Sequence, residues 1–269
     1  MNINLDSNLV STEWLNTHIK ASNLVILDAT INKVIDTASV RIPKARFFDI
    51  KQKFSDVAAP FPNTLPSVEQ FQKETRAIGI NTNSAIVVYD DKGIYSCARA
   101  WWLFKVFGFN NVAVLDGGLP DWQNNGFMIE TYKSDDFLEG DFEAELYSEL
   151  MTDFDGVNDF SKDKNALILD ARSETRFKCQ VDEPRAGLRR GTIPNSNNLP
   201  YTALLNGNKM KSIEELSKIF NNLVKDKTKI VFSCGSGITA CILALGATLC
   251  NINNLTVYDG SWTEYGSLT

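Results

Sequence analysis

The sequence predicts an α/β protein made of two consecutive copies of one fold, each a mostly parallel β-sheet flanked by helices. The first observation is that short apolar runs rich in β-branched residues alternate with helical patterns, as in βα units. The second is an internal repeat, in which four segments recur in the same order at nearly constant separation. The third is a polar, acidic stretch over 130–149. Because such stretches commonly link domains, we expect one domain over 1–135 and a second over 136–269.

Six apolar runs are expected to form the central strands, three in each half of the chain. They cover 24–27, 85–89 and 112–115, and then 166–169, 229–233 and 255–258. Two helices are expected to begin with the S-x-x-E/Q pattern of a capping box, one at Ser67 with Gln70 and one at Ser212 with Glu215.

The repeat places two different residues at equivalent positions after a strand. It pairs LVILDAT (24–30) with ALILDAR (166–172), IPKARFFDI (42–50) with IPNSNNLPY (193–201), AIVVYD (85–90) with KIVFSC (229–234), and VLDGG (114–118) with VYDGS (257–261). The third pair sets Asp90 against Cys234. Ligand sites of open α/β sheets lie beyond the carboxyl ends of the strands. Only the second copy has a nucleophile there, so we expect the first domain to be catalytically inactive and the second to be active.

Composition and charge exclude several classes of function. The net charge of −6 and the scattered basic residues argue against a nucleic-acid partner. The chain has no apolar run long enough for a membrane span and no basic-then-apolar leader, so we expect a cytoplasmic protein without a membrane partner. Five cysteines without disulfide-framework spacing suit a reducing compartment. With His18 as the only histidine and no CxxC pair, we expect neither a metal nor a cofactor.

The segment KIVFSCGSGITACILAL (229–245) predicts a buried strand, a short loop and an apolar helix, with Cys234 where the strand ends. Glycines permit a tight loop, whose N–H groups can point inward as an anion-binding nest beside the positive end of the helix. Both effects stabilise a thiolate, so Cys234 is the predicted nucleophile. The loop residues expected to hold the substrate or a bound persulfide are Gly235, Ser236, Gly237, Ile238 and Thr239.

The residues around Cys234 are also compared with the patterns of three other roles. Cys234 could be a small buried hydrophobic residue, which is what we expect of Cys97, Cys241 and Cys250, but the adjacent glycines favour a functional role. A cysteine phosphatase would need an arginine six residues after the cysteine, where this chain has Ala240. A dinucleotide fingerprint in the same loop would need further strands of a Rossmann sheet, and too few residues follow to supply them.

The loop from Cys234 to Ala240 resembles the active-site loop of 3-mercaptopyruvate sulfurtransferases, within the tandem rhodanese family. The similar motifs are FFDI (47–50), YSCARAWWLFKVFG (95–108), LDGGLPDW (115–122), DARSETRF (170–177), DEPRAG (182–187) and YDGSWTEYG (258–266). The resemblance implies two rhodanese-like domains and sulfur transfer through a persulfide on Cys234, with release of pyruvate. It also implies that Arg176 and Arg185 bind the substrate, since an arginine fork can hold a carboxylate through two hydrogen bonds.

The neutral residues Gly235 and Ser236 favour 3-mercaptopyruvate as the donor, because thiosulfate-preferring relatives carry basic side chains there. A thiosulfate:cyanide sulfurtransferase and a non-catalytic persulfide relay remain the alternatives. The expected acceptor is a thiol, such as thioredoxin or glutathione, or cyanide. Lys51 and Asn63 stand where the family often has an aspartate and a histidine, so no Ser–His–Asp relay is expected and the proton donor stays open.

Overall fold

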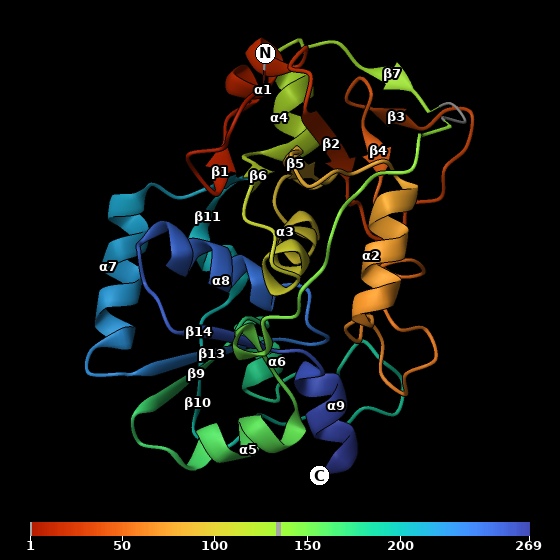
Figure 1. Ribbon diagram of the computed structural model, residues 1–269. Helices are drawn as coiled ribbons and strands as arrows, with labels where there is room; N and C mark the ends of the chain where they lie inside the picture. The colour runs from red at the N-terminus through yellow and green to blue at the C-terminus, as the bar shows by residue number, and fades with distance from the viewer. Residues whose placement is uncertain (1, 133–135) are drawn as a thin grey trace. The chain divides into compact units, whose positions relative to one another are not determined.

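The computed structural model describes residues 2–132 and 136–269 (Figure 1). The chain divides into two compact units, each of which takes in a short segment from the other half of the sequence. The first consists of Met1–Asp56, Leu65–Leu146 and Gly207–Met210, and the second of Val57–Thr64, Tyr147–Asn206 and Lys211–Thr269. The boundary expected after residue 135 adjoins 133–135, which lie outside the described residues, and it stays a prediction.

The first unit, as far as it is described, contains a five-stranded parallel sheet in the order β1-β6-β5-β2-β4. Its strands are β1 (Leu9–Val10), β2 (Leu24–Asp28), β4 (Arg46–Phe47), β5 (Ala85–Tyr89) and β6 (Val112–Leu115). The helices are α1 (Thr12–His18), α2 (Val68–Ala77), α3 (Cys97–Val106) and α4 (Gly118–Asn124), and β3 (Val40–Arg41) pairs antiparallel with β7 (Glu130–Thr131). His18 ends α1, stacked on Trp14 with ring centroids 4.2 Å apart.

Among the described residues of the second unit, a parallel sheet has the order β10-β9-β13-β14-β8. Its strands are β8 (Met151–Thr152), β9 (Ala166–Asp170), β10 (Ser196–Asn198), β13 (Lys229–Ser233) and β14 (Leu255–Tyr258). The helices are α5 (Phe154–Lys162), α6 (Glu174–Phe177), α7 (Ile213–Val224), α8 (Ala240–Leu249) and α9 (Ser261–Leu268), with 3-10 turns η1 (Ser148–Leu150) and η2 (Tyr201–Leu204). The hairpin of β11 (Leu205–Asn206) and β12 (Lys209–Met210) lies where the chain passes between units.

The two sheets have the same topology, which confirms the predicted repeat. In each unit the first strand along the chain (β1 or β8) lies at one edge of the sheet. The strand that precedes Asp90 or Cys234 (β5 or β13) lies in the middle. All six expected central strands form, and β2 and β9 each extend one residue further than expected. They are buried on both faces, as in parallel sheets covered by helices, which is why they are continuous apolar runs in the sequence.

The two expected helix starts differ in how completely the cap forms. At Ser212 the capping box is complete, because the Glu215 side chain also accepts a hydrogen bond from the Ser212 backbone N–H. At Ser67 only half of it forms, because the Gln70 amide donates instead to the carbonyls of Lys53 and Ser55. The competing acceptors therefore replace the second half of the box without displacing the helix start.

In the second unit, helices cover both faces of the sheet. Side chains of α5 and α9, including Val157 and Trp262, pack with Ile168, Val231 and Tyr258 of the strands on one face. Figure 1 shows these two helices on the same side of the sheet. The apolar helix α8 packs on β13 and β14 and is buried from Ala240 to Ala247. This places the start of α8 beside the carboxyl end of β13, where the cysteine loop lies.

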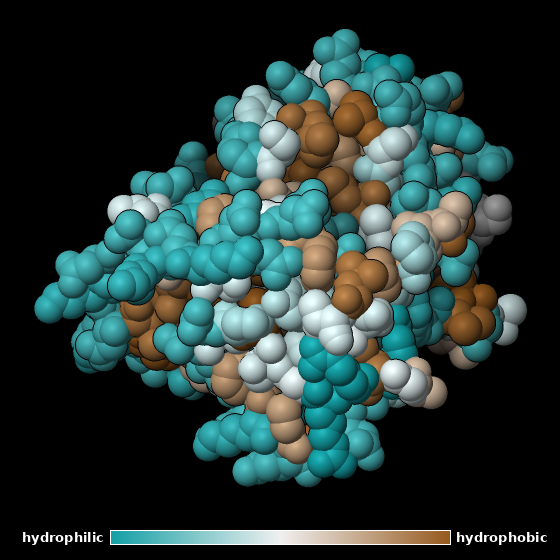
Figure 2. All heavy atoms as spheres, turned by 90° about the horizontal axis from the view of Figure 1, so that it is seen from below, coloured by the Kyte–Doolittle hydropathy of each residue, from teal (hydrophilic) through white to brown (hydrophobic). Residues whose placement is uncertain are grey.

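The face in Figure 2 is mostly hydrophilic, with hydrophobic side chains in separate smaller groups. Among the helices of the described chain, none is both long and apolar enough to cross a bilayer.

Candidate active site

The cysteine loop follows β13 directly and leaves the Cys234 side chain almost fully buried, at 2% exposure. Its two glycines are needed for different reasons. Gly237 has a φ of 78°, a left-handed conformation that other residues rarely adopt. At Gly235, by contrast, an added β-carbon would lie 2.9 Å from Nη2 of Arg176, so a larger residue there would displace this guanidinium.

Ser261, the first residue of α9, holds the loop through its hydroxyl group. Its Oγ accepts hydrogen bonds from the backbone N–H groups of Cys234, at 3.0 Å, and Gly237, at 3.2 Å. Its own hydrogen has two acceptors within reach, the Tyr258 carbonyl oxygen at 2.9 Å and Cys234 Sγ at 3.8 Å. One of the loop amides expected to hold the substrate or persulfide, that of Gly237, is therefore bonded to Ser261 instead.

The conformation of Ser261 indicates that its hydroxyl matters. Its φ is 51°, and the repeat-equivalent residue in the first unit is Gly118, with a φ of 53°. A left-handed conformation at a non-glycine residue costs free energy. In the second unit this cost falls on Ser261, whose hydroxyl accepts hydrogen bonds from two loop N–H groups.

The remaining loop amides are turned away from α9. The N–H groups of Trp262 and Thr263 donate to the carbonyls of Cys234, at 3.0 Å, and Gly235, at 2.9 Å. Because N–H and C=O point in opposite directions across a planar trans peptide, the N–H groups of Gly235 and Ser236 point away from α9. Neither these two groups nor the N–H groups of Ile238 and Thr239 have an acceptor in the described part of the chain. The loop therefore offers several backbone donors next to Cys234.

The equivalent loop of the first unit already holds an anion, which is the carboxylate of Asp90. Oδ1 accepts from the N–H of Lys92 at 2.8 Å, and Oδ2 accepts from Tyr95 at 2.8 Å and Cys97 at 2.9 Å. The same turn of chain in the second unit has the shorter side chain of Cys234 in place of this carboxylate. The pair of loops thus indicates that this turn binds negative charge.

Asn63 lies in the segment 57–64 that belongs to the second unit, and it contacts the loop serine. Its Nδ2 donates to the Ser236 carbonyl oxygen at 3.0 Å and to Ser236 Oγ at 3.1 Å. The Ser236 hydroxyl thus accepts from Asn63, which leaves its own proton for another acceptor. Lys51, in the first unit, donates to Asn32 Oδ1 at 3.0 Å.

The two arginines expected to bind the substrate have different surroundings. Arg176, in α6, lies against Gly235 and forms an ion pair with Glu183 at 2.5 Å. Arg185 is exposed and has no side-chain hydrogen bond or ion pair to the described residues. The structure brings Arg176 to the loop, whereas no contact joins Arg185 to it. Ile238 is buried, and the Thr239 side chain does not cap α8.

The other cysteines have the surroundings of unreactive thiols. Cys97 and Cys241 are buried in α3 and α8, and burial raises the pKa of the Cys97 thiol well above its ordinary value. Cys250 follows the end of α8 and is only half-buried, so the expectation that it is a buried residue was wrong.

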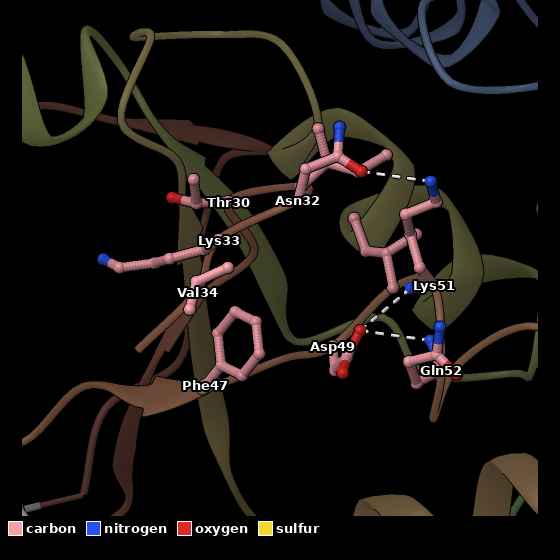
Figure 3. Close-up of a pocket in the computed structure, with 10 residues that line it drawn as sticks. Thr30, Asn32, Lys33, Val34, Phe47, Asp49, Lys51 and Gln52 are labelled. Carbon is pink, nitrogen blue, oxygen red and sulfur yellow. Dashed lines mark hydrogen bonds between the residues drawn. The ribbon is translucent and has the colours of Figure 1, made fainter. Parts of the chain in front are cut away.

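A cavity of about 320 Å³ in the first unit does not offer comparable chemistry (Figure 3). It is lined by Thr30, Ile31, Asn32, Lys33, Val34, Phe47, Asp49, Ile50, Lys51 and Gln52. Asp49 accepts from the backbone of Lys51 and Gln52, and the Lys33 ammonium bonds Asp28. Its charged groups are therefore partnered within the unit, and no cysteine is among its lining residues. Nor do the described residues group histidine, cysteine and carboxylate side chains as a metal site would.

Comparison with known proteins adds to this geometry. The sequence model of the rhodanese-like domain matches residues 11–125 and again 154–268. The 3-mercaptopyruvate sulfurtransferase of Escherichia coli K12 is 37% identical over 96% of this chain and 94% of its own length. The human 3-mercaptopyruvate sulfurtransferase is 35% identical over 96% of this chain and 91% of its own length. The crystal structure of SseA from Escherichia coli has a TM-score of 0.83 and 34% identity, covering 95% of this chain and 99% of that one. This chain belongs to the rhodanese-like domain family and contains two copies of the domain.

Proposed function

We propose that this protein transfers sulfur from 3-mercaptopyruvate to an acceptor thiol or to cyanide through a persulfide on Cys234, and releases pyruvate. The observation that carries the proposal is the pair of loops. In the first unit the loop amides bind the Asp90 carboxylate, and in the second the N–H groups of Gly235, Ser236, Ile238 and Thr239 have no acceptor in the described chain. An anionic sulfur bonded to Cys234 would meet those donors. The names of the similar enzymes support the choice of donor.

The first half-reaction is a nucleophilic attack by the Cys234 thiolate on the sulfur of 3-mercaptopyruvate. A sulfur–sulfur bond forms as the carbon–sulfur bond breaks, and the electron pair of the latter passes to the enolate of pyruvate. Protonation of that enolate gives pyruvate and leaves Cys234 as a persulfide. In this proposal Arg176 and Arg185 hold the carboxylate and carbonyl of the donor, and Arg185 must move its exposed side chain to do so.

In the second half-reaction an acceptor thiolate attacks the outer sulfur and displaces the Cys234 thiolate. Dividing the transfer into two displacements is covalent catalysis, so ping-pong kinetics are expected. The loop residues Gly235, Ser236, Gly237, Ile238 and Thr239 surround the persulfide in this scheme. Ser236, whose Oγ accepts from Asn63, can donate its hydroxyl proton to the leaving enolate.

We place the reaction in the cytoplasm, with a reduced thiol such as thioredoxin or glutathione as the acceptor. The five cysteines, all within the described residues, are free thiols. Unpaired cysteines are typical of proteins from reducing compartments. The same compartment supplies the low-molecular-weight and protein thiols that the second half-reaction consumes.

Exposure to 3-mercaptopyruvate without an acceptor should add one sulfur atom to the peptide that contains Cys234. Mass spectrometry of the digested protein measures this, and the peptide with half-buried Cys179 serves as the internal control. The specificity constant should be higher for 3-mercaptopyruvate than for thiosulfate, because Gly235 and Ser236 bring no positive charge to the loop. A Cys234 peptide of unchanged mass would refute the proposal. A higher specificity constant for thiosulfate would identify thiosulfate as the donor instead. Sulfur uptake only from a partner protein would favour a persulfide relay.

Replacing Asn63 with glycine should lower kcat for 3-mercaptopyruvate about five-fold, which corresponds to the loss of a hydrogen bond worth about 1 kcal/mol. Glycine is the appropriate replacement because Asn63 has a φ of 60°. The matched control is Asn32→Gly, since Asn32 has the same φ and contacts Lys51 instead of the loop. Steady-state kinetics with both variants decide the point. Equal kcat in the two variants would mean that Asn63 does not orient Ser236.

A further inference from the structure

Arg176 is the partly exposed end of a buried chain of alternating charges in the second unit. Arg172 binds Asp170 through Nε and Nη2, with the shortest contact at 2.7 Å, and binds Glu183 Oε1 through Nη1 at 2.8 Å. Glu183 Oε2 in turn accepts from Arg176 Nε, at 3.2 Å, and Nη2, at 2.5 Å. The side chains of Arg172 and Glu183 are 0% and 1% exposed, whereas that of Arg176 is 25% exposed.

We propose that Glu183 is a positioning residue, which orients Arg176 to bind a donor that carries a carboxylate. This rests on the proposed function, in that Arg176 is taken to bind the substrate. In this proposal Glu183 determines which edge of the Arg176 guanidinium faces the donor. Motif resemblance had pointed to Arg176 and Arg185, and not to the glutamate between them.

The hydrogen bonds decide which edge of Arg176 is free. A guanidinium has an Nε–H, two hydrogens on Nη1 and two on Nη2, and Glu183 takes the Nε–H and one hydrogen of Nη2. Both hydrogens of Nη1 and the second of Nη2 have no partner among the described residues. These remaining groups form the end-on fork, which matches a carboxylate bidentately. Glu183 therefore occupies one edge of Arg176 and leaves the edge suited to a carboxylate ligand.

The chain of charges also ties Arg176 to the nucleophile. The Arg172 guanidinium stacks on the Trp262 ring at 4.9 Å, and the Trp262 backbone N–H donates to the Cys234 carbonyl oxygen. Arg176 Nη2 lies where a β-carbon at position 235 would be 2.9 Å away. The position of the free fork relative to Cys234 is thus set by buried groups, through Glu183, and not by the flexible stem of Arg176.

Alkylation of Cys234 tests this without using a sulfur donor. Iodoacetate carries a carboxylate next to its reactive carbon, whereas iodoacetamide is neutral and nearly the same size. In Glu183→Gln the ratio of the two second-order rate constants, iodoacetate to iodoacetamide, should fall about ten-fold because the carboxylate is no longer held in line. The iodoacetamide rate should stay close to that of the unmodified protein. The matched control is Glu174→Gln, which removes an exposed negative charge from α6, the helix that contains Arg176. Among the described residues, the Glu174 carboxylate pairs only with Lys178.

A second variant guards against misfolding. Glu183→Asp keeps the charge beside Arg172 but retracts it from Arg176, so it should show a smaller drop in the same ratio and a raised KM for 3-mercaptopyruvate. An unchanged ratio in both variants overturns the proposal, and so does an equal fall in both alkylation rates, which would indicate a general disturbance of the loop. If the ratio falls as expected while Cys234 accepts no sulfur from 3-mercaptopyruvate, the positioning role stands and the proposed function fails.

Discussion

Cys234→Ser is expected to lower the rate of sulfur transfer by at least about a thousand-fold, as found when a catalytic nucleophile is removed. A serine hydroxyl is not ionised near neutral pH and forms no persulfide, so the first half-reaction has no route. Serine has nearly the volume of cysteine, and the side chain sits at 2% exposure, so the fold should persist. Turnover with 3-mercaptopyruvate and an acceptor thiol measures the effect.

The control for this variant is Cys179→Ser, which changes a half-buried thiol of the same unit. It should keep most of the activity and should still acquire sulfur on Cys234. If Cys234→Ser retained substantial turnover, or if Cys179→Ser abolished it, another cysteine would be the sulfur carrier.

Arg172→Met is expected to lower the free energy of unfolding by about 3–5 kcal/mol, which is typical when one partner of a buried ion pair is removed. Arg172 is fully buried between Asp170 and Glu183, and methionine fills part of its volume without its charge. Two carboxyl groups would then lie in the interior without their shared cation. Urea denaturation followed by far-ultraviolet circular dichroism gives the difference. The matched control is Lys178→Met, which breaks an exposed pair and should change stability by less than about 1 kcal/mol.

The loss in Arg172→Met should depend on pH, and its sign follows from Asp170. Burial raises the pKa of Asp170, and the hydrogen bonds and charge of Arg172 oppose that rise. Without Arg172 the pKa in the folded state rises further above the unfolded value, so the folded protein binds the proton more tightly. Stability then increases as the pH falls, and the deficit relative to the unmodified protein should be smaller at acid pH than at neutral pH. A deficit independent of pH would mean that Asp170 is not left charged in the interior.

Most of the fold could be predicted from the sequence because the central strands are buried on both faces. Burial makes 85–89 and 229–233 continuous apolar runs, and the duplication places each beside an equivalent run in the other half. The edge strands β1, β4 and β8 have two residues each, too short for any periodicity. The local sequence pattern does not predict that 57–64 belongs to the second unit or that 207–210 belongs to the first. Which unit each segment joins depends on which surfaces the folded loops reach.

The cysteine that we propose as the nucleophile could be identified from the sequence, whereas the residues that support its loop could not. Cys234 lies in a recognisable strand–glycine–helix pattern, but Ser261 reaches the loop from 27 positions further along the chain. One signal was available, because the repeat has glycine at 118 and serine at 261, and a side chain at a left-handed position requires a reason. Glu183 had a weaker signal, as an acidic residue among motif arginines. Its buried contacts with both Arg172 and Arg176 appear only in three dimensions.

The carboxylate of Asp90 has a consequence for how the two copies have diverged. The first copy contains its own counter-ion, so its turn is complete as soon as the chain folds and needs nothing from solution. Under the proposed function, the second copy would reach the equivalent state only while a persulfide is present on Cys234, and it would lose that state whenever the sulfur is transferred. In that case the first loop keeps one level of stability, whereas the second would alternate between two levels of stability during each turnover.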